Sequence, residues 1–204
     1  MDATDAFVFS PPGAATVAAS AADLSALVDR LGAAVLSQDL GDGNREPSAL
    51  LAVEALLDAV RWLKEERGYG YLRSLTAVDF WQRGSPRFQV VYHLAAIPAG
   101  MLAGDPRPRP DEPTRLLRLK VGLPAENPVA PSLTGIFPTA GFHERETYDM
   151  FGIEFAGHPD LRRILMPEGY EGFPLRKDHP LQYEEIAFSF NQETVYASKP
   201  FAKE

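Results

Sequence analysis

Three segments of this chain are predicted to be strands, and the alternation of apolar and polar residues in the second and third constrains the fold more than any other feature of the sequence. The segments span residues 71–81, 87–97 and 114–123. In the second segment, Phe88, Val90, Tyr92 and Leu94 fill the alternate positions, and His93 lies on the other face. Alternation with one polar face is typical of antiparallel strands that pack on one side. We therefore predict a small, mostly antiparallel sheet.

A helix is predicted before these strands, and it supplies the cover that the apolar face of the sheet requires. Its apolar residues recur at helical spacing and form one stripe, while charged residues face away. The stripe consists of Val53, Leu56, Leu57, Val60 and Leu63. Pro47 suits the first turn of this helix, and Gly68 suits the position just after its end. Core packing accounts for the stripe without a cofactor site.

Shorter elements are predicted on either side of this helix. Leu24, Leu27 and Leu31 indicate a helix over residues 20–31 that ends at Gly32, and residues 33–37 favour a strand. Residues 1–20 are rich in Ala, Pro, Ser and Thr, which is typical of a flexible arm. Residues 98–113 form a long proline-rich loop. Helices that cover a mostly antiparallel sheet define an α+β fold.

A charged segment, residues 143–180, follows the predicted sheet. It holds eight acidic residues and five Lys or Arg, set among large apolar residues such as Tyr148 and Phe151. Charged side chains are rarely buried unless they are paired. Both kinds of residue in one segment therefore predict charges that are partly buried and paired. The residues alone leave open whether the pairs form inside the chain or across a contact with another protein.

Within this segment, residues 140–151 predict a helix with Thr139 as its N-cap and Gly152 after its end. Arg145 and Asp149 are four residues apart on this helix and are predicted to pair. Beyond it, frequent glycine and proline predict an extended path as far as Asp178. The chain thus divides into a flexible arm (1–20), an α+β core domain (21–142), a charged docking segment (143–181) and a C-terminal tail (182–204).

Catalysis and metal binding are alternative hypotheses for the charged segment. Acid–base catalysis in a stand-alone hydrolase or lyase would use Glu144, Glu146 or Asp149 with His143 or His158. A metal site would use His143, Glu146 and His158. No nucleophile–base constellation, glycine-rich phosphate loop or H-E-x-x-H spacing accompanies these residues. An interface is favoured because arginine and aromatic residues are enriched at protein–protein contacts.

Composition excludes several other functions. The chain has no cysteine, which removes disulfides, thiolate nucleophiles, thiolate zinc sites and ordinary iron–sulfur ligation. Its formal charge of −8 and its lack of a basic patch argue against nucleic-acid binding. No apolar run approaches the ~20 residues that cross a bilayer, and the first residues lack the basic region of a secretory signal. We expect a soluble cytoplasmic protein that reaches a membrane only through a partner.

The charged segment also carries a long motif, and this motif resembles that of the C subunit of respiratory NADH:quinone oxidoreductase (complex I). The family includes corresponding subunits of related membrane-bound hydrogenases. The residues that carry the resemblance are Glu144-Arg145-Glu146, Asp149, Phe151-Gly152-Ile153, residues 157–161, Arg163-Ile164-Leu165, Gly172 and residues 174–178. Residues 75–80 and 88–92 resemble two strands of the same family. The likeness covers residues 46–181.

The resemblance implies a structural subunit in the hydrophilic arm of a proton-translocating NADH:quinone oxidoreductase. Such a subunit binds no cofactor itself, although the complex uses FMN, iron–sulfur clusters, NADH and quinone. It docks against the subunits that carry the quinone site and the terminal iron–sulfur cluster, as a peripheral protein on the cytoplasmic side of the inner membrane. The alternative is the equivalent subunit of a related hydrogenase or of a complex with another electron donor.

The resemblance assigns the charged residues of the segment to partner docking, and it assigns none to catalysis, cofactor binding or metal binding. The predicted docking residues are Glu144, Arg145, Glu146, Asp149, His158, Asp160, Arg162, Arg163, Arg176, Lys177 and Asp178.

Overall fold

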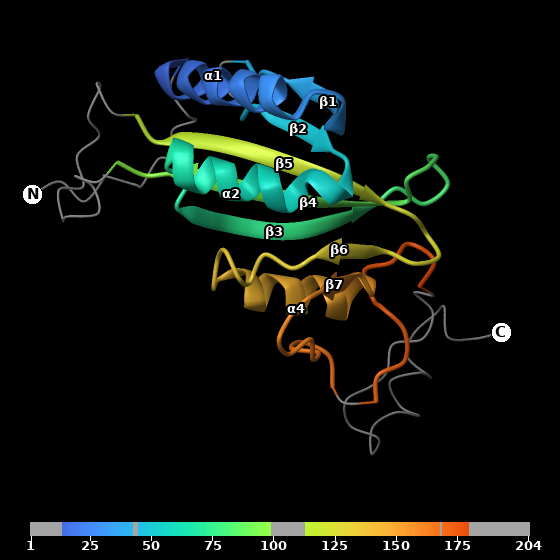
Figure 1. Cartoon of the computed structure of the whole chain (residues 1–204). Helices are drawn as coiled ribbons and strands as arrows, with labels where there is room; N and C mark the ends of the chain where they lie inside the picture. The colour runs from blue at the N-terminus through green and yellow to red at the C-terminus, as the bar shows by residue number, and fades with distance from the viewer. Residues whose placement is uncertain (1–13, 43–44, 99–112, 168, 180–204) are drawn as a thin grey trace, which may run out of the picture.

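A computed structural model describes residues 14–42, 45–98, 113–167 and 169–179. Most of the predicted arm, almost all of the proline-rich loop and the predicted C-terminal tail lie outside the described residues. Figure 1 shows helices α1 and α2 beside a five-stranded sheet, with α4 and a long irregular segment next to strand β3. The α+β fold class is confirmed.

The sheet has the strand order β1-β2-β5-β4-β3. Its strands are β1 (Val35–Asp39), β2 (Ser48–Leu51), β3 (Tyr71–Asp79), β4 (Phe88–Ala96) and β5 (Arg115–Leu123). The three predicted strands over residues 71–81, 87–97 and 114–123 are confirmed and pair antiparallel, as does β1 with β2. Strand β2 pairs parallel with β5 and was not predicted, because its four residues are almost all buried and show no alternation.

The two N-terminal helices differ from their predicted bounds. Helix α1 spans Ala14–Leu31, so the predicted flexible arm is helical from residue 14 onward. Buried Val17 extends the apolar stripe backwards by two turns from Leu24. Helix α2 spans Leu56–Arg67 after a short 3₁₀ helix, η2 (Val53–Ala55). The prediction for Pro47 is wrong, because Pro47 precedes β2, whereas Gly68 follows α2 in the predicted left-handed conformation, with φ of 74°.

The apolar face of the sheet and the helices form one continuous core. The alternating residues predicted for this face, including Phe88, Val90, Tyr92 and Leu94, are fully buried there. The opposite face is polar. On it, Arg73 and His93 both contact Glu46, and His93 Nδ1 lies 3.0 Å from Glu46 Oε2. The hydrogen bond with His93 is the main cause that lowers the pKa of Glu46 to about 2.

Helix α4 (Ala140–Phe151) lies next to β3 and has the predicted bounds. Gly152 ends it in the left-handed conformation, as predicted. Thr139 occupies the predicted N-cap position, but its backbone is already helical and its side chain makes no capping hydrogen bond. Two short strands, β6 (Val129–Pro131) and β7 (Glu154–Ala156), flank α4 in sequence and pair in parallel. Their pairing fixes where the charged segment leaves the helix.

Candidate docking segment

Glu144 lies on α4 with its carboxylate fully buried. It accepts hydrogen bonds from the Ser132 hydroxyl at 2.6 Å and from the backbone N–H of Leu133 at 2.7 Å. Burial raises the pKa of Glu144, and these two donors and His158 offset the rise only in part. Glu144 thus ties the turn after β6 to the helix, and it presents no surface to a partner.

His158 packs against the same carboxylate. Its Nε2 lies 3.1 Å from the carbonyl of Gly141 and 4.0 Å from Glu144 Oε2. Its Nδ1 accepts the backbone N–H of Asp160. The side chain is only 2% exposed, and His158 therefore fixes, from inside the fold, the start of the irregular segment that follows β7 (residues 157–179), which is called the segment below.

Asp149 is the central anchor of the segment. Its Oδ2 accepts three consecutive backbone N–H groups, from Ile164, Leu165 and Met166, at 2.7–3.0 Å, while Oδ1 lies 3.2 Å from an Arg163 nitrogen. Burial alone would raise the pKa of Asp149, but these hydrogen bonds and the charge of Arg163 outweigh it and hold the pKa below its usual range. Asp149 is fully buried, so it also presents no surface to a partner.

A second anchor joins the end of the segment to the sheet. Asp79, the last residue of β3, is buried and accepts from Arg87, from the backbone N–H of Trp81 and from that of Lys177. Arg87 also binds Asp178 at 2.7 Å. Burial would raise the pKa of Asp79, yet Arg87 and the backbone donors hold it below its usual range. Asp178 is thus engaged inside the chain through a residue 91 positions away.

Arg176 closes the segment over the end of α4. Its guanidinium donates to the carbonyls of Phe151 and Gly152, and it lies 4.6 Å from the centroid of the Phe173 ring and 5.2 Å from that of Phe88. A Cβ on Gly152 would overlap both the Phe173 ring and the Arg176 guanidinium. This close approach is a second reason, beside its positive φ, for glycine at position 152.

The predicted pair between Arg145 and Asp149 is wrong. Arg145 instead donates to the backbone carbonyls of Arg162 and Arg163, because Asp149 points into the fold towards the returning segment. Glu146 is exposed and pairs with no cation among the described residues. Asp160 and Arg162 form an ion pair of 2.7 Å at the surface. Lys177 is exposed, and its backbone rather than its side chain holds Asp79.

Sequence reasoning missed two groups of residues. Asp79 and Arg87 anchor the segment from the sheet, and an aspartate at an inward-facing position of an alternating strand was the available signal. The second group consists of large apolar side chains that are exposed, and it is called the exposed apolar set below. Its members are Phe142, Ile164, Leu165 and Leu175, with fractional exposures of 66%, 39%, 61% and 54% in that order.

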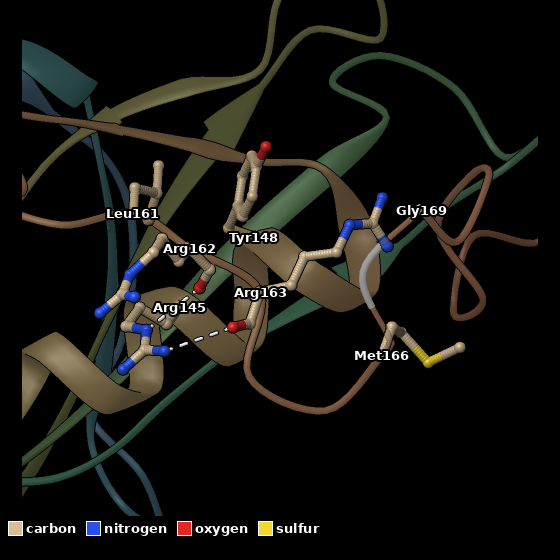
Figure 2. Close-up of a pocket in the computed structure, with 7 residues that line it drawn as sticks. All are labelled: Arg145, Tyr148, Leu161, Arg162, Arg163, Met166 and Gly169. Atoms are coloured by element: carbon tan, nitrogen blue, oxygen red, sulfur yellow. Dashed lines mark hydrogen bonds between the residues drawn. The ribbon is translucent and has the colours of Figure 1, made fainter.

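A hollow of about 400 Å³ lies between α4 and the residues that follow β7 (Figure 2). It is lined by Arg145, Tyr148, Leu161, Arg162, Arg163, Met166 and Gly169. In the described part of the chain, no group of three or more His, Asp or Glu side chains is arranged to hold a metal ion. The metal site suggested for His143, Glu146 and His158 is thus not assembled, since His158 faces the buried Glu144. No described helix is long and apolar enough to cross a membrane.

Comparison with known proteins decides the family. The model of the "Respiratory-chain NADH dehydrogenase, 30 Kd subunit" family matches residues 50–185, which include both anchors. The chain belongs to this family. The C subunit of the NADH-quinone oxidoreductase of Roseiflexus sp. (strain RS-1) is 46% identical over 90% of this chain and 99% of that protein. The corresponding protein of Roseiflexus castenholzii is 52% identical over 74% of this chain and 79% of that protein.

Two solved structures resemble this chain in fold. A chain described as "Nqo5 of the trypsin-resistant fragment (1-134) in P63 form" aligns with a TM-score of 0.54 and 28% identity, over 68% of this chain and 99% of that chain. A chain of the membrane-bound sulfane sulfur reductase, an archaeal respiratory membrane complex, aligns with a TM-score of 0.63 over 89% of this chain and 94% of that chain. At 18% identity, the second likeness shows a shared fold.

Proposed function

We propose that this chain is a cofactor-free structural subunit of the hydrophilic arm of a proton-translocating NADH:quinone oxidoreductase. It docks through residues 143–181 against the subunits that carry the quinone site and the terminal iron–sulfur cluster. It lies on the cytoplasmic side of the membrane and reaches that membrane through the complex. The names of its relatives favour NADH as the electron donor over the donors of related complexes.

One observation carries this proposal: Ile164, Leu165 and Leu175 of the exposed apolar set lie on a segment that buried carboxylates and Arg176 hold to the fold. Asp149 and Arg176 hold the segment to the fold, while Leu165 and Leu175 remain 61% and 54% exposed. Fixing an apolar side chain at the surface gains nothing for a free monomer, because that surface stays in water. It favours a partner, since a preorganised segment loses little conformational entropy when it binds.

The predicted docking residues accordingly divide into two groups. Glu144, His158 and Asp149 are buried, and their role is to hold the segment. Arg163, Arg176 and Asp178 are also engaged within the chain. The second group consists of Arg145, Glu146, Asp160, Arg162 and Lys177, which are at least partly exposed and can contact a partner together with the exposed apolar set.

The test is assembly of the complex with the double variant Leu165→Ser and Leu175→Ser. We expect the variant to retain its fold and to be depleted from the purified complex, with a matching loss of NADH:quinone reductase activity. Leu40→Ser is the matched control, because Leu40 is 46% exposed and follows β1, away from α4. Normal incorporation of the double variant would contradict docking through this set.

The absence of a cofactor is tested separately. The purified chain is expected to show no flavin absorbance and no stoichiometric iron. A wild-type chain that purifies alone from its native cells, and is active without partners, would contradict the structural role as a whole.

A further inference from the structure

The hollow beside α4 combines three guanidinium groups with apolar walls. Arg145 comes from α4, and Arg162 and Arg163 come from the segment that returns across it. Leu161, Met166 and the ring of Tyr148 supply the apolar part of the lining. Figure 2 shows the lining side chains, with Arg145 hydrogen-bonded to two backbone carbonyls.

The three arginines differ in how their charges are compensated. Arg163 pairs with Asp149 and Arg162 with Asp160. Arg145 bonds only carbonyl oxygens, and among the described residues no carboxylate lies within 4.0 Å of it. The field of Arg145 does reach Asp160, whose pKa is lowered mainly by its hydrogen bond with Arg162. The hollow therefore carries one guanidinium charge without a direct ionic partner, in a chain whose net charge is −8.

The Arg145 guanidinium is also presented in a fixed orientation. Two nitrogens of Arg145 bind the carbonyls of Arg162 and Arg163 at 3.0 and 3.3 Å, and Figure 2 shows the third nitrogen on the side away from both. A guanidinium has five N–H donors, of which these bonds use two. A planar guanidinium held in this way is suited to a carboxylate, which it can bind through two parallel hydrogen bonds.

We propose that this hollow binds an acidic segment of a neighbouring subunit, with an aspartate or glutamate on Arg145 and an adjacent apolar side chain against Leu161 and Met166. This inference rests on the proposed function, because it assumes that the chain docks. Beyond the proposed function, it names the place of one contact with a partner and the chemistry of the partner residues that bind there. The apolar lining distinguishes a peptide, which brings both kinds of group, from a small inorganic anion, which would leave Leu161 and Met166 uncovered.

Photo-cross-linking in the assembled complex tests the occupant. Met166 is replaced by p-benzoylphenylalanine, which leaves the backbone bond from Met166 to Asp149 in place. We expect an adduct with a peptide of another subunit that has an aspartate or glutamate within a few residues of the attachment point. An adduct with lipid, an adduct with a peptide that lacks acidic residues, or no adduct overturns the proposal.

The same replacement at Leu165 separates this proposal from the proposed function. Leu165 is exposed and lies outside the hollow. An adduct from position 165 without one from position 166 means that the segment docks and the hollow stays empty. If neither position gives an adduct in the complex, docking through the segment fails as well.

Substitution of Arg145 tests the charge. Arg145→Gln keeps an amide donor for the carbonyls but removes the charge, and we expect release of the subunit from the complex to become about tenfold faster. Arg145→Lys restores the charge but not the planar fork of donors, so it should recover only part of the wild-type stability of the complex. Arg61→Gln, on the exposed side of α2, is the control for loss of one surface charge and should have no effect. Equal rates of release for the Gln and Lys variants would show that Arg145 acts only through its hydrogen bonds to the carbonyls of Arg162 and Arg163. That result would overturn the proposal.

Discussion

Residues 14–123 and residues 124–179 are held together by different interactions. In the first region, two helices and five strands bury apolar side chains in a shared core, with Leu27, Leu63 and Leu119 fully buried. In the second region, helix α4 adds a few residues to that core, but the segment after β7 is irregular and leaves Leu165 and Leu175 exposed. Buried carboxylates and arginines provide most of its attachment.

The two regions use charged side chains for different purposes. The polar face of the sheet in the first region carries ion pairs that are partly solvated, such as Arg73 with Glu46. The irregular part of the second region is held by Asp149 and, from strand β3 of the first region, by Asp79; both are buried and accept its backbone N–H groups. An irregular segment must satisfy its amides elsewhere. The carboxylates therefore replace the hydrogen-bonding partners that a helix or sheet would supply.

Asp149→Ala should have the largest effect of a single substitution on the second region. It leaves three backbone N–H groups and Arg163 without their acceptor, and loss of one partner of a buried pair costs about 3–5 kcal/mol. We expect amide hydrogen exchange at residues 164–166 to accelerate strongly, while exchange in β4 and β5 stays slow. A uniform acceleration throughout the sheet would show that the two regions unfold as one unit.

Leu119→Ala tests the first region in the same way. Leu119 is fully buried at the centre of the sheet, and removal of such a side chain costs about 2–5 kcal/mol of unfolding free energy. The loss should appear in urea unfolding of the purified chain as a lower midpoint of the main transition. Because the core supports the segment, exchange at residues 164–166 should also accelerate. Faster exchange at residues 164–166 without a lower urea midpoint would contradict the dependence of the segment on the core.

As the pH is lowered, the second region should lose its hydrogen-exchange protection before the first region does. The pKa values of Asp149, Asp79 and Asp178 lie below the ordinary value of 3.8 in the folded chain. Their contribution to stability is therefore fully present above about pH 4 and is lost as the pH falls through the lowered values. Glu144 has the opposite sign, because its raised pKa makes protonation favourable to folding.

Hydrogen exchange measured between pH 5 and pH 2, corrected for intrinsic rates, would follow this release. We expect protection at residues 164–166 to decrease before protection in β4. Simultaneous loss in both places would show that these carboxylates do not control the segment separately.

Gly152→Ala should have a smaller and more local effect. The new methyl group would meet the Phe173 ring and the Arg176 guanidinium at a backbone φ of 68°, and we expect a loss of about 1–3 kcal/mol. Gly157→Ala is the matched control, because φ there is 86° but nothing lies within 4 Å of the added atom. The control reports backbone strain alone, about 1 kcal/mol. Equal losses of urea stability in the two variants would mean that the packing of Phe173 and Arg176 contributes nothing.

Asp160→Asn should have the smallest effect. Asp160 and Arg162 form a close ion pair, but their side chains are 50% and 76% exposed, and such pairs contribute little to stability. The urea midpoint of the variant should stay within experimental error of the wild type. A clear loss would place Asp160 among the anchors of the segment rather than at its surface.

The prediction of this site from sequence succeeded where the signal was local. The bounds of α4 and the left-handed Gly152 follow from residues within one or two helical turns. The i,i+4 rule failed for Arg145 and Asp149, because it assumes a solvated helix surface, and Asp149 finds four stronger donors in a segment 14–17 residues further on. Strand β2 was missed for a similar reason, since its parallel partner β5 is far away in the chain.

By itself, the sequence determined which residues form the three antiparallel strands, which face of them is buried, and that some charges of residues 143–180 are buried and paired. Periodicity and charge count are properties of residues that are close in the sequence, so they can be recognised without a structure. Only the tertiary structure decided which charges pair inside the chain and which side chains remain for a partner. Burial and pairing depend on contacts such as Asp79 with Lys177, 98 residues apart, that no local pattern encodes.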